Sequence, residues 1–309
     1  MGGSEPRIAR LYLYPDLRRR VEEGRRGFLT TLCGVLRDNG FDVRICGDDP
    51  DELAKARDRS GYSIVRMIDP PSPRGVTFRR TYFAPFWHIE GSAARWDWPV
   101  AKASFDPADV KPHKAERFMT NMRARHFPGA TTSRDGLVLI PLQGRLLEKR
   151  SFQTCTPLQM VQAVLEHDKT HRIHATLHPS ETYSPQEIAA LEDLSHRFPR
   201  LSYGKGETDR FLPVCDYVVT MNSSVALAGY FLEKPAALFG RIDFHHIAAK
   251  AHDLGAEATL GAVPDLRPDY AAYLWWFLRD MAIDDSRPDA ETRIVQALVR
   301  AGWPMKGAS

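Results

Sequence analysis

The chain has 309 residues, which suggests about two domains of ordinary size. Hydrophobic residues make up 43% of it and charged residues 26%, a balance that excludes a disordered protein. The 42 lysines and arginines exceed the 39 aspartates and glutamates by only three, so the basic surplus of a typical nucleic-acid binder is missing. No window offers the run of about 20 apolar residues that a membrane-spanning helix needs, and we expect neither nucleic acid nor an integral membrane segment.

The amino terminus and the cysteines indicate a cytoplasmic protein. Residues 1–6 lack the apolar core of a signal peptide, and Pro6 stands where a myristoylation signal requires serine or threonine. The four cysteines form no CxxC pair, so we expect neither a metal site nor disulfides. Peripheral contact with the inner face of the membrane could use the basic runs at 18–20 and 25–26, although a solvated helix face is the better interpretation. The cysteines are Cys33, Cys46, Cys155 and Cys215.

The first hundred residues open as a strand, a helix and a strand. Residues 8–14 alternate like a strand, and residues 24–39 carry apolar side chains at helical spacing before a stop at Gly40. Residues 41–45 alternate again, and this order begins a parallel α/β sheet. We further expect a polar helix over 51–60, a strand over 62–67 and a loop over 69–75.

Residues 76–100 are dense in aromatic side chains and allow two interpretations. One is a cluster that packs one domain against the next, which is the commoner use of aromatic residues. The other is a binding wall for a sugar or a lipid-linked acceptor, because flat apolar rings match the C–H faces of sugars. Packing is the favoured interpretation.

A polar helix over 109–126 precedes the clearest linker signal of the chain. Residues 127–136 are rich in proline, glycine, serine and threonine, and we place the domain boundary there. The expected domains are residues 1–130 and 131–309, with the last helices crossing back to the first domain.

The second half restarts the α/β alternation. Residues 137–142 form a continuous apolar run, as expected of a parallel strand buried on both faces. Thr156 and Pro157 begin a helix that reaches about residue 168, and Ser184 begins another with a capping-box pattern. The overall pattern indicates an α/β fold of two domains with a cleft between them. Further strands are expected at 172–177, 200–203, 216–221 and 235–239, and a further helix at 225–232.

Three polar groups follow strands of the second half, where ligands of open α/β sheets bind. They are the segments 143–145, 178–179 and 222–224. The third is a small polar turn that leads into a helix, so its free amides and the helix dipole would suit a phosphate. An ordinary helix N-cap is the alternative interpretation of that turn.

Other side chains near these strand ends could take part in chemistry. His178 could donate to a phosphate or act as an acid or base, and Pro179 fixes its turn. Lys205 lies between two glycines in an expected loop and could pair with a phosphate. The adjacent His245 and His246 lack the spacing of a zinc site. The carboxylates available for acid–base or nucleophilic work are Glu148, Glu181 and Asp243, each of which could equally be solvated surface.

Read in order, these segments form a recognisable set. It comprises the PLQ strand end at 141–143, the HP motif at 178–179, the N-S-S turn at 222–224 and a K-P strand that ends at Gly240. The set resembles the capsular-polysaccharide synthesis proteins related to the bacterial β-Kdo glycosyltransferases. The resemblance covers about residues 137–245, with a weaker echo at 273–278, and does not reach the first 130 residues.

The resemblance implies a GT-B-like fold, in which two Rossmann-like domains face a cleft. It implies a glycosyltransferase that moves a sugar, in that family Kdo from CMP-Kdo, to a cell-surface polysaccharide or glycolipid acceptor without a cofactor. Glu148 and His178 become the expected catalytic residues. The expected nucleotide-sugar-binding residues are Gln143, Gly144, Arg145, His178, Pro179, Lys205, Asn222, Ser223 and Ser224.

Two departures from the family pattern leave other functions open. The acidic residue that usually follows the PLQ glutamine closely arrives only at Glu148, and Glu233 replaces the usual glycine before Lys234. A non-catalytic binding or scaffold protein with a degenerate fold is therefore an alternative. A nucleotide-sugar epimerase is a second alternative, although no distinct pair of acids is visible for it.

Overall fold

The computed structural model describes residues 7–306, so the stretch 1–6 considered above for processing signals lies outside it. The described chain divides into two compact units. Unit 1 comprises the residues up to Val100 and those from Phe277 onward, and unit 2 comprises Ala101–Trp276. The division falls about thirty residues before the expected boundary, and residues 127–136 lie inside unit 2. The segment from Phe277 groups with unit 1.

Unit 1 is built on a six-stranded sheet in the order β12-β5-β4-β3-β1-β2. The four strands β2, β1, β3 and β4 are parallel, β5 runs antiparallel to β4, and β12 runs antiparallel to β5. The expected strand–helix–strand opening is confirmed by β1, α2 and β2, since β1 pairs with β2 over its whole length. The strands are β1 (Ile8–Leu13), β2 (Asp42–Gly47), β3 (Tyr62–Arg66), β4 (Gly75–Arg80), β5 (Phe86–Glu90) and β12 (Ile283–Asp284).

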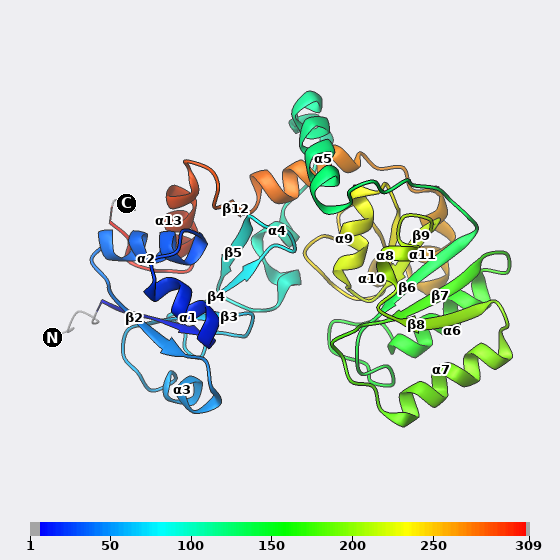
Figure 1. Cartoon of the computed structure of the whole chain (residues 1–309), viewed down its shortest axis with the longest axis horizontal. Coiled ribbons are helices and arrows are strands. Elements are labelled where there is room, and N and C mark those ends of the chain that lie inside the picture. Colours follow the sequence, from blue (N-terminus) through cyan, green and yellow to red (C-terminus); the bar gives the residue numbers. More distant parts are fainter. Residues whose placement is uncertain (1–6, 307–309) are drawn as a thin grey trace. The chain divides into compact units, whose positions relative to one another are not determined.

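Two helices from opposite ends of the chain cover one face of this sheet. They are α2 (Phe28–Asp38) and α13 (Ala290–Arg300), which contact each other, and α13 also contacts β5 (Figure 1). The apolar stripe of α2 is buried as its spacing predicts. Ile294 and Leu298 of α13 join the same core, together with Trp303. The carboxyl-terminal segment therefore completes the hydrophobic core of unit 1.

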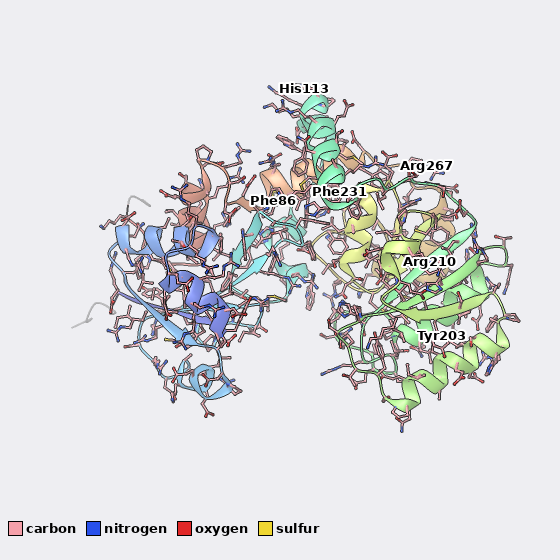
Figure 2. All side chains as sticks on the ribbon, viewed as in Figure 1. Phe86, His113, Tyr203, Arg210, Phe231 and Arg267 are labelled. Atoms are coloured by element: carbon pink, nitrogen blue, oxygen red, sulfur yellow. The ribbon has the colours of Figure 1, made fainter. Side chains whose placement is uncertain are left out.

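The aromatic stretch 76–100 contributes two strands, β4 and β5, that the sequence analysis did not resolve. Trp87 stacks on Phe28 with ring centroids 4.6 Å apart and planes at 6°. Phe86, labelled in Figure 2, is 1% exposed, and Trp98 is buried against His88 with a centroid distance of 5.0 Å. These rings pack inside unit 1, which agrees with a structural use of this stretch.

Unit 2 is built on a parallel sheet in the order β11-β10-β9-β6-β7-β8. Renumbered along the chain, this is the 3-2-1-4-5-6 order of a Rossmann fold. The first strand, β6, is buried along its whole length, as its apolar run predicts. The strands are β6 (Leu137–Leu142), β7 (Arg172–Leu177), β8 (Leu201–Lys205), β9 (Tyr217–Thr220), β10 (Ala236–Leu238) and β11 (Ala249–Lys250).

Helices cover both faces of the unit 2 sheet. α6 (Pro157–His167) contacts α7 (Pro185–Arg197) and α11 (Ala256–Ala262), whereas α9 (Ser224–Phe231) contacts α5 (Pro112–His126) and α12 (Tyr270–Trp275) (Figure 1). The capping box predicted at Ser184 is present, and the N-cap predicted at Thr156 is also a full capping box, each with a reciprocal side-chain bond three residues on. These caps fix where α6 and α7 begin, directly after the loops that leave β6 and β7.

Short helices complete the chain, and none of the helices described between residues 7 and 306 is long and apolar enough to cross a membrane. The basic run on the first of these helices is exposed and partly paired with acids, as a solvated face requires: Arg19 lies 2.9 Å from Asp16 and Arg18 3.9 Å from Glu22. The short helices are α1 (Pro15–Glu22), α3 (Pro50–Lys55), η1 (Arg95–Asp97), α4 (Pro99–Lys102), η2 (Pro107–Asp109), α8 (Thr208–Phe211), α10 (Ala251–Leu254), η3 (Val263–Asp265) and η4 (Trp276–Asp280).

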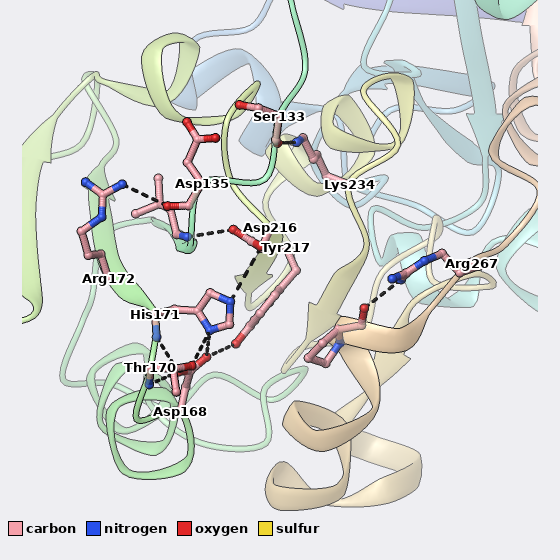
Figure 3. A network of polar contacts seen from close by, with 12 residues as sticks. Ser133, Asp135, Asp168, Thr170, His171, Arg172, Asp216, Tyr217, Lys234 and Arg267 are labelled. Carbon is pink, nitrogen blue, oxygen red and sulfur yellow. Dashed lines mark hydrogen bonds and ion pairs between the residues drawn. The ribbon is translucent and has the colours of Figure 1, made fainter.

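A polar network ties together the amino ends of β6, β7 and β9 (Figure 3). Asp168 accepts hydrogen bonds from the Tyr217 hydroxyl at 2.7 Å and from the amides of Thr170 and His171 at 2.9 Å. His171 Nδ1 lies 2.7 Å from Asp168, and Asp216 accepts from the Leu137 amide at 2.8 Å. Burial would raise the pKa of Asp168, but these hydrogen bonds and the nearby imidazole outweigh it and hold the pKa well below its usual range.

Candidate functional site

The candidate site lies at the opposite, carboxyl edge of the unit 2 sheet. The order in which strands are added to this sheet reverses between β6 and β9, because β7 and β8 lie on one side of β6 and the later strands on the other. This is the topological switch point where ligands of such folds bind. A small pocket opens there. It is lined by Pro141, Leu142, Gln143, Arg150, Pro157, Met160, Thr220 and Met221.

Pro141 explains locally why the sheet opens at this point. β6 pairs with β7 along all six residues but with β9 only at Val138 and Leu139. Pro141 has no amide hydrogen to continue the ladder toward β9. Its carbonyl instead accepts a hydrogen bond from the Thr220 hydroxyl at 2.9 Å. The two strands therefore separate toward their carboxyl ends, and the pocket lies in the gap.

A buried glutamate of α7 binds the backbone of the loop after β6. Glu187 accepts hydrogen bonds from the amides of Ser184 and Leu146, and Leu146 itself is fully buried. Burial would raise the pKa of Glu187, but these backbone donors keep it below the usual range. Arg145 adopts a positive φ of 65°, which is costly for a residue with a side chain. The segment that contains Gln143 and Arg145 is thus fixed in one conformation.

Two carboxylates lie near this loop in different settings. Glu148 is 64% exposed and faces Arg145 at 3.6 Å, so its surroundings are those of a surface ion pair. Glu181 lies closer to the turn: a Cβ built at Gly144 would stand 2.6 Å from its Oε2. Any larger residue at Gly144 would push Glu181 away. Glu181 is therefore the carboxylate that the structure brings against the Gln143–Arg145 turn.

His178 follows β7 in a turn that orients its ring. The amide of Ser180 donates to His178 Nδ1 at 3.2 Å, so in the neutral ring the proton lies on Nε2. The amide of His178 donates to the Tyr183 hydroxyl at 2.8 Å, and that hydroxyl lies 3.5 Å from the Leu142 carbonyl. The side chain is exposed, and Nε2 has no partner within residues 7–306. His178 thus presents a donor at the edge of the sheet, beside the end of β6.

Lys205 does not lie in a loop, as the flanking glycines suggested, but is the last residue of β8. It pairs with Leu177 at the end of β7, and its side chain is exposed. A Cβ built at Gly206 would stand 3.9 Å from Pro179, so Lys205 and the His178–Pro179 turn belong to the same edge. The lysine is available to a ligand there even though the predicted local structure is wrong.

The Asn222–Ser224 turn forms the N-cap of α9, and this role uses some of the groups that an anion could bind. Ser223 Oγ accepts from the Val225 amide at 3.3 Å and its carbonyl from the Ala226 amide at 3.1 Å, which is the ordinary capping role. The Ser223 amide lies 3.4 Å from Thr220 Oγ1. The Ser224 amide and hydroxyl have no partner in the described chain, and Asn222 is buried beside them. Fewer amides are therefore available to an anion than the sequence indicated.

The remaining candidates lie in packed surroundings. His245 and His246 stack with ring centroids 4.3 Å apart, and their Nε2 atoms lie 3.0 and 3.1 Å from the carbonyls of Ala101 and Ala103. They secure the segment that leads into α5. Asp243 is fully buried in the loop after β10. All four cysteines are free, and no group of three or more metal-ligating side chains occurs among residues 7–306.

Sequence reasoning overlooked two polar residues that the structure brings to this edge. Arg150 lines the pocket although it lies eight residues beyond β6, and it resembled surface charge beside Lys149. Gln153 is 2% exposed and forms an isolated bridge with Gly240, which follows β10. In the sequence, a role for Gln153 was indicated by nothing more than its being a polar residue shortly before the N-cap of α6 at Thr156.

The comparisons with known proteins concern the fold. Neither a protein-family model nor a curated protein matches this sequence. Among solved structures, the chain is similar to the protein described as Thermosulfurimonas dismutans KpsC, beta Kdo 2,7 transferase, with 14% identity and a TM-score of 0.55 over 96% of this chain and 99% of that one. The chain has a GT-B-like fold. A second similar structure, Thermosulfurimonas dismutans KpsC, beta Kdo 2,4 transferase, has 12% identity and a TM-score of 0.45, over 88% and 90% of the two chains.

This likeness agrees with the resemblance that the PLQ, HP and N-S-S segments indicated. The sequence-based fold class, two Rossmann-like α/β units of the GT-B type, is confirmed. An identity of 14% carries the fold and no further property, so the site residues stay predictions.

Proposed function

We propose that this protein is a glycosyltransferase whose nucleotide-sugar donor binds at the carboxyl edge of the unit 2 sheet. The supporting observation is where the predicted ligand-binding turns lie in the fold. The three segments that the sequence indicates as ligand-binding turns follow β6, β7 and β9, which are neighbouring strands of this GT-B-like fold, and Gln143 of the first segment lines the pocket at the β6/β9 switch point. A fold with this strand order binds nucleotides at that place.

Each residue of the proposed site has a role that follows from its chemistry. His178 Nε2 and the Ser224 amide donate to a donor phosphate, and Lys205 adds a positive charge. Gln143, a neutral side chain at the pocket, contacts the sugar. A carboxylate, Glu148 or Glu181, serves the acid–base or nucleophilic step. The favoured donor is CMP-Kdo or a related acidic sugar nucleotide, and the favoured acceptor is a glycan or glycolipid of the cell surface, assembled on the cytoplasmic side.

Titration with CMP, UDP and GDP, followed by CMP-Kdo, tests this proposal. We expect calorimetric binding of one nucleotide. His178→Ala should weaken that binding by about 1.5–3 kcal/mol, because a hydrogen bond to a charged group is lost. Ser224→Ala should cost less, since the amide remains. No binding of any nucleotide would refute the proposal, and unchanged affinity in His178→Ala would assign that residue a structural role.

A non-catalytic binding protein is the second candidate, favoured by the setting of Glu148. A catalytic carboxylate usually lies in a cleft, partly shielded from water, whereas Glu148 is 64% exposed beside Arg145. Sugar transfer from CMP-Kdo, monitored by release of CMP, separates the two functions. Loss of turnover in Glu148→Gln or Glu181→Gln, with binding retained, identifies the catalytic carboxylate. Nucleotide binding without turnover in the wild-type protein favours the binding role.

A further inference from the structure

Three side chains at the carboxyl edge of unit 2 carry buried polar atoms without hydrogen-bond partners among residues 7–306. They are Arg150, through Nε and Nη2, Gln153, through Nε2, and Asn222, through Oδ1. Gln153 is 2% exposed and Asn222 5%. Buried donors and acceptors are almost always paired in native proteins, so a cluster of unpaired ones needs an explanation.

The three side chains belong to one place. Arg150 lines the same pocket as Thr220 and Met221, and Asn222 follows Met221 directly. Gln153 Oε1 accepts a hydrogen bond from the Arg150 amide at 2.8 Å. Gln153 also bridges to Gly240, whose amide donates to the Met221 carbonyl at 2.8 Å. The three residues thus lie near the carboxyl ends of β6, β9 and β10.

The guanidinium of Arg150 is held in position without an acid. Its Cζ lies 4.9 Å from the centre of the Phe152 ring, a cation–π contact that fixes its plane. A Cβ built at Gly240 would stand 3.2 Å from that ring, so glycine at 240 allows the ring to lie there. Burial and the nearby Arg145 charge lower the pKa of Arg150. Glu148 faces Arg145 instead, and no carboxylate of the described chain lies within ion-pair distance of Arg150.

The free atoms of Arg150 have a particular geometry. Nε and Nη2 lie on the same side of the guanidinium and donate in parallel, which matches the two oxygens of a carboxylate or a phosphate. Gln153 Nε2 is a further donor, and Asn222 Oδ1 is an acceptor. This set of three donors and one acceptor is complementary to an oxyanion that has a hydroxyl group nearby.

We propose that Arg150 and Gln153 form an oxyanion site at this edge, with Asn222 accepting from a hydroxyl of the same ligand. Its donors, Arg150 and Gln153, are different residues from the phosphate donors His178 and Ser224, and Asn222 joins the two groups, so the proposed site takes a second anionic group of the same ligand. This proposal rests on the proposed function and deepens it, because it selects donors with two anionic groups. The second group is either the carboxylate of an acidic sugar or the second phosphate of a nucleoside diphosphate.

Two variants test the site in the full-length chain. Arg150→Lys keeps the charge but loses the parallel pair of donors. Gln153→Glu keeps the Oε1 acceptor for the Arg150 amide and places a carboxylate beside the guanidinium, so that the site is filled from within. Arg197→Lys is the matched control, because Arg197 is exposed on α7 and pairs with Asp193 at 3.1 Å. Thermal unfolding verifies that each variant folds.

Calorimetric titrations with CMP, CMP-Kdo, UDP-glucose and inorganic pyrophosphate separate the two sources of the anion. For a carboxylate, Arg150→Lys and Gln153→Glu should weaken CMP-Kdo about tenfold to a hundredfold and leave CMP within twofold. For a second phosphate, the same loss should fall on UDP-glucose and pyrophosphate. Gln153→Glu should also raise the unfolding temperature in the absence of ligand, since it pairs a buried cation.

The outcomes distinguish this proposal from the proposed function. If the wild-type protein binds a nucleotide but both variants bind every probe within twofold of wild type, the oxyanion site is refuted and the proposed function stands. If no nucleotide binds, the proposed function fails, and free Kdo and pyrophosphate then test the site alone. Binding of either that Arg150→Lys abolishes supports the site, and no binding of either refutes it.

Discussion

The polar side chains at the two edges of the unit 2 sheet differ in whether they have hydrogen-bond partners. At the amino edge, Asp168 accepts from two amides, an imidazole and the Tyr217 hydroxyl, and these groups satisfy one another. At the carboxyl edge, Arg150, Gln153 and Asn222 keep buried atoms without partners in the described chain. A satisfied network stabilises the fold by itself, whereas an unsatisfied one costs stability until a ligand completes it. On our proposal, the same sheet thus has a structural edge and a binding edge.

The strongest test of this contrast is Asp168→Ala. The substitution leaves the buried Tyr217 hydroxyl and the partly buried amides of Thr170 and His171 without an acceptor. We expect a loss of about 3 kcal/mol in the free energy of unfolding, measured by denaturant titration. Nucleotide affinity should change by less than twofold, because the network lies at the far end of the strands. A large change in affinity with intact stability would contradict the assignment.

Acid should remove part of the same stabilisation. The pKa of Asp168 is lowered in the folded protein, so its contribution is present above the unfolded value of about 3.9 and is lost as the pH falls below it. We expect the wild-type protein to lose about 1–2 kcal/mol from this group on acidification, less than the alanine variant loses, because a protonated carboxyl still accepts a bond. Unfolding temperatures recorded from pH 6 to pH 3 measure this loss. Asp168→Asn should depend less on pH in that range, and an equal dependence would refute the assignment.

Asn222→Leu, at the carboxyl edge, should lower ligand affinity strongly and change stability little, the reverse of Asp168→Ala. Oδ1 is a buried acceptor with no partner in the described chain, so its removal takes away a desolvation cost. We expect the ligand-free protein to change by no more than about 1 kcal/mol, in either direction. Affinity for the bound nucleotide sugar should fall at least tenfold. A strongly destabilised variant would show that Asn222 belongs to the structural network instead.

The smallest effect is expected at the helix cap. Ser223→Ala removes the hydroxyl that accepts from the Val225 amide at 3.3 Å, a long capping bond. We expect a loss of about 0.5–1 kcal/mol in the free energy of unfolding. Ser224→Ala is the matched control, because its hydroxyl is exposed and has no partner within residues 7–306. Equal stability of the two variants would remove the capping role from Ser223.

Elements set by local signals could be predicted from the sequence. The strands β6 and β7 occupy the ranges that their apolar runs predicted, and the caps at Thr156 and Ser184 are where the motifs indicated. The strand ends therefore also placed Gln143, His178 and Asn222 at one edge. These predictions succeeded because periodicity and capping act over a few residues.

The misses depend on features that composition and spacing along the chain do not mark. β4 and β5 are joined by a turn in which Tyr82 adopts a positive φ of 60°, and no glycine or asparagine marks that position. The glycines around Lys205 suggested a loop. In fact, β8 continues there, and Gly204 gives room to Glu207, which lies 3.2 Å from His174. The role of Arg150 depends on a loop that folds back over the sheet, which spacing along the chain does not reveal.

The division of the chain also orders its folding during synthesis. Unit 2 is one continuous stretch, Ala101–Trp276, whereas unit 1 needs Ile294, Leu298 and Trp303 to close the core around α2. Because a ribosome makes the chain from its amino terminus, unit 2 can fold while the sheet of unit 1 still lacks α13. During that interval the apolar face of α2 and β5 stays incompletely covered. The part of unit 1 that precedes Ala101 thus reaches its final surroundings only after unit 2 has been made.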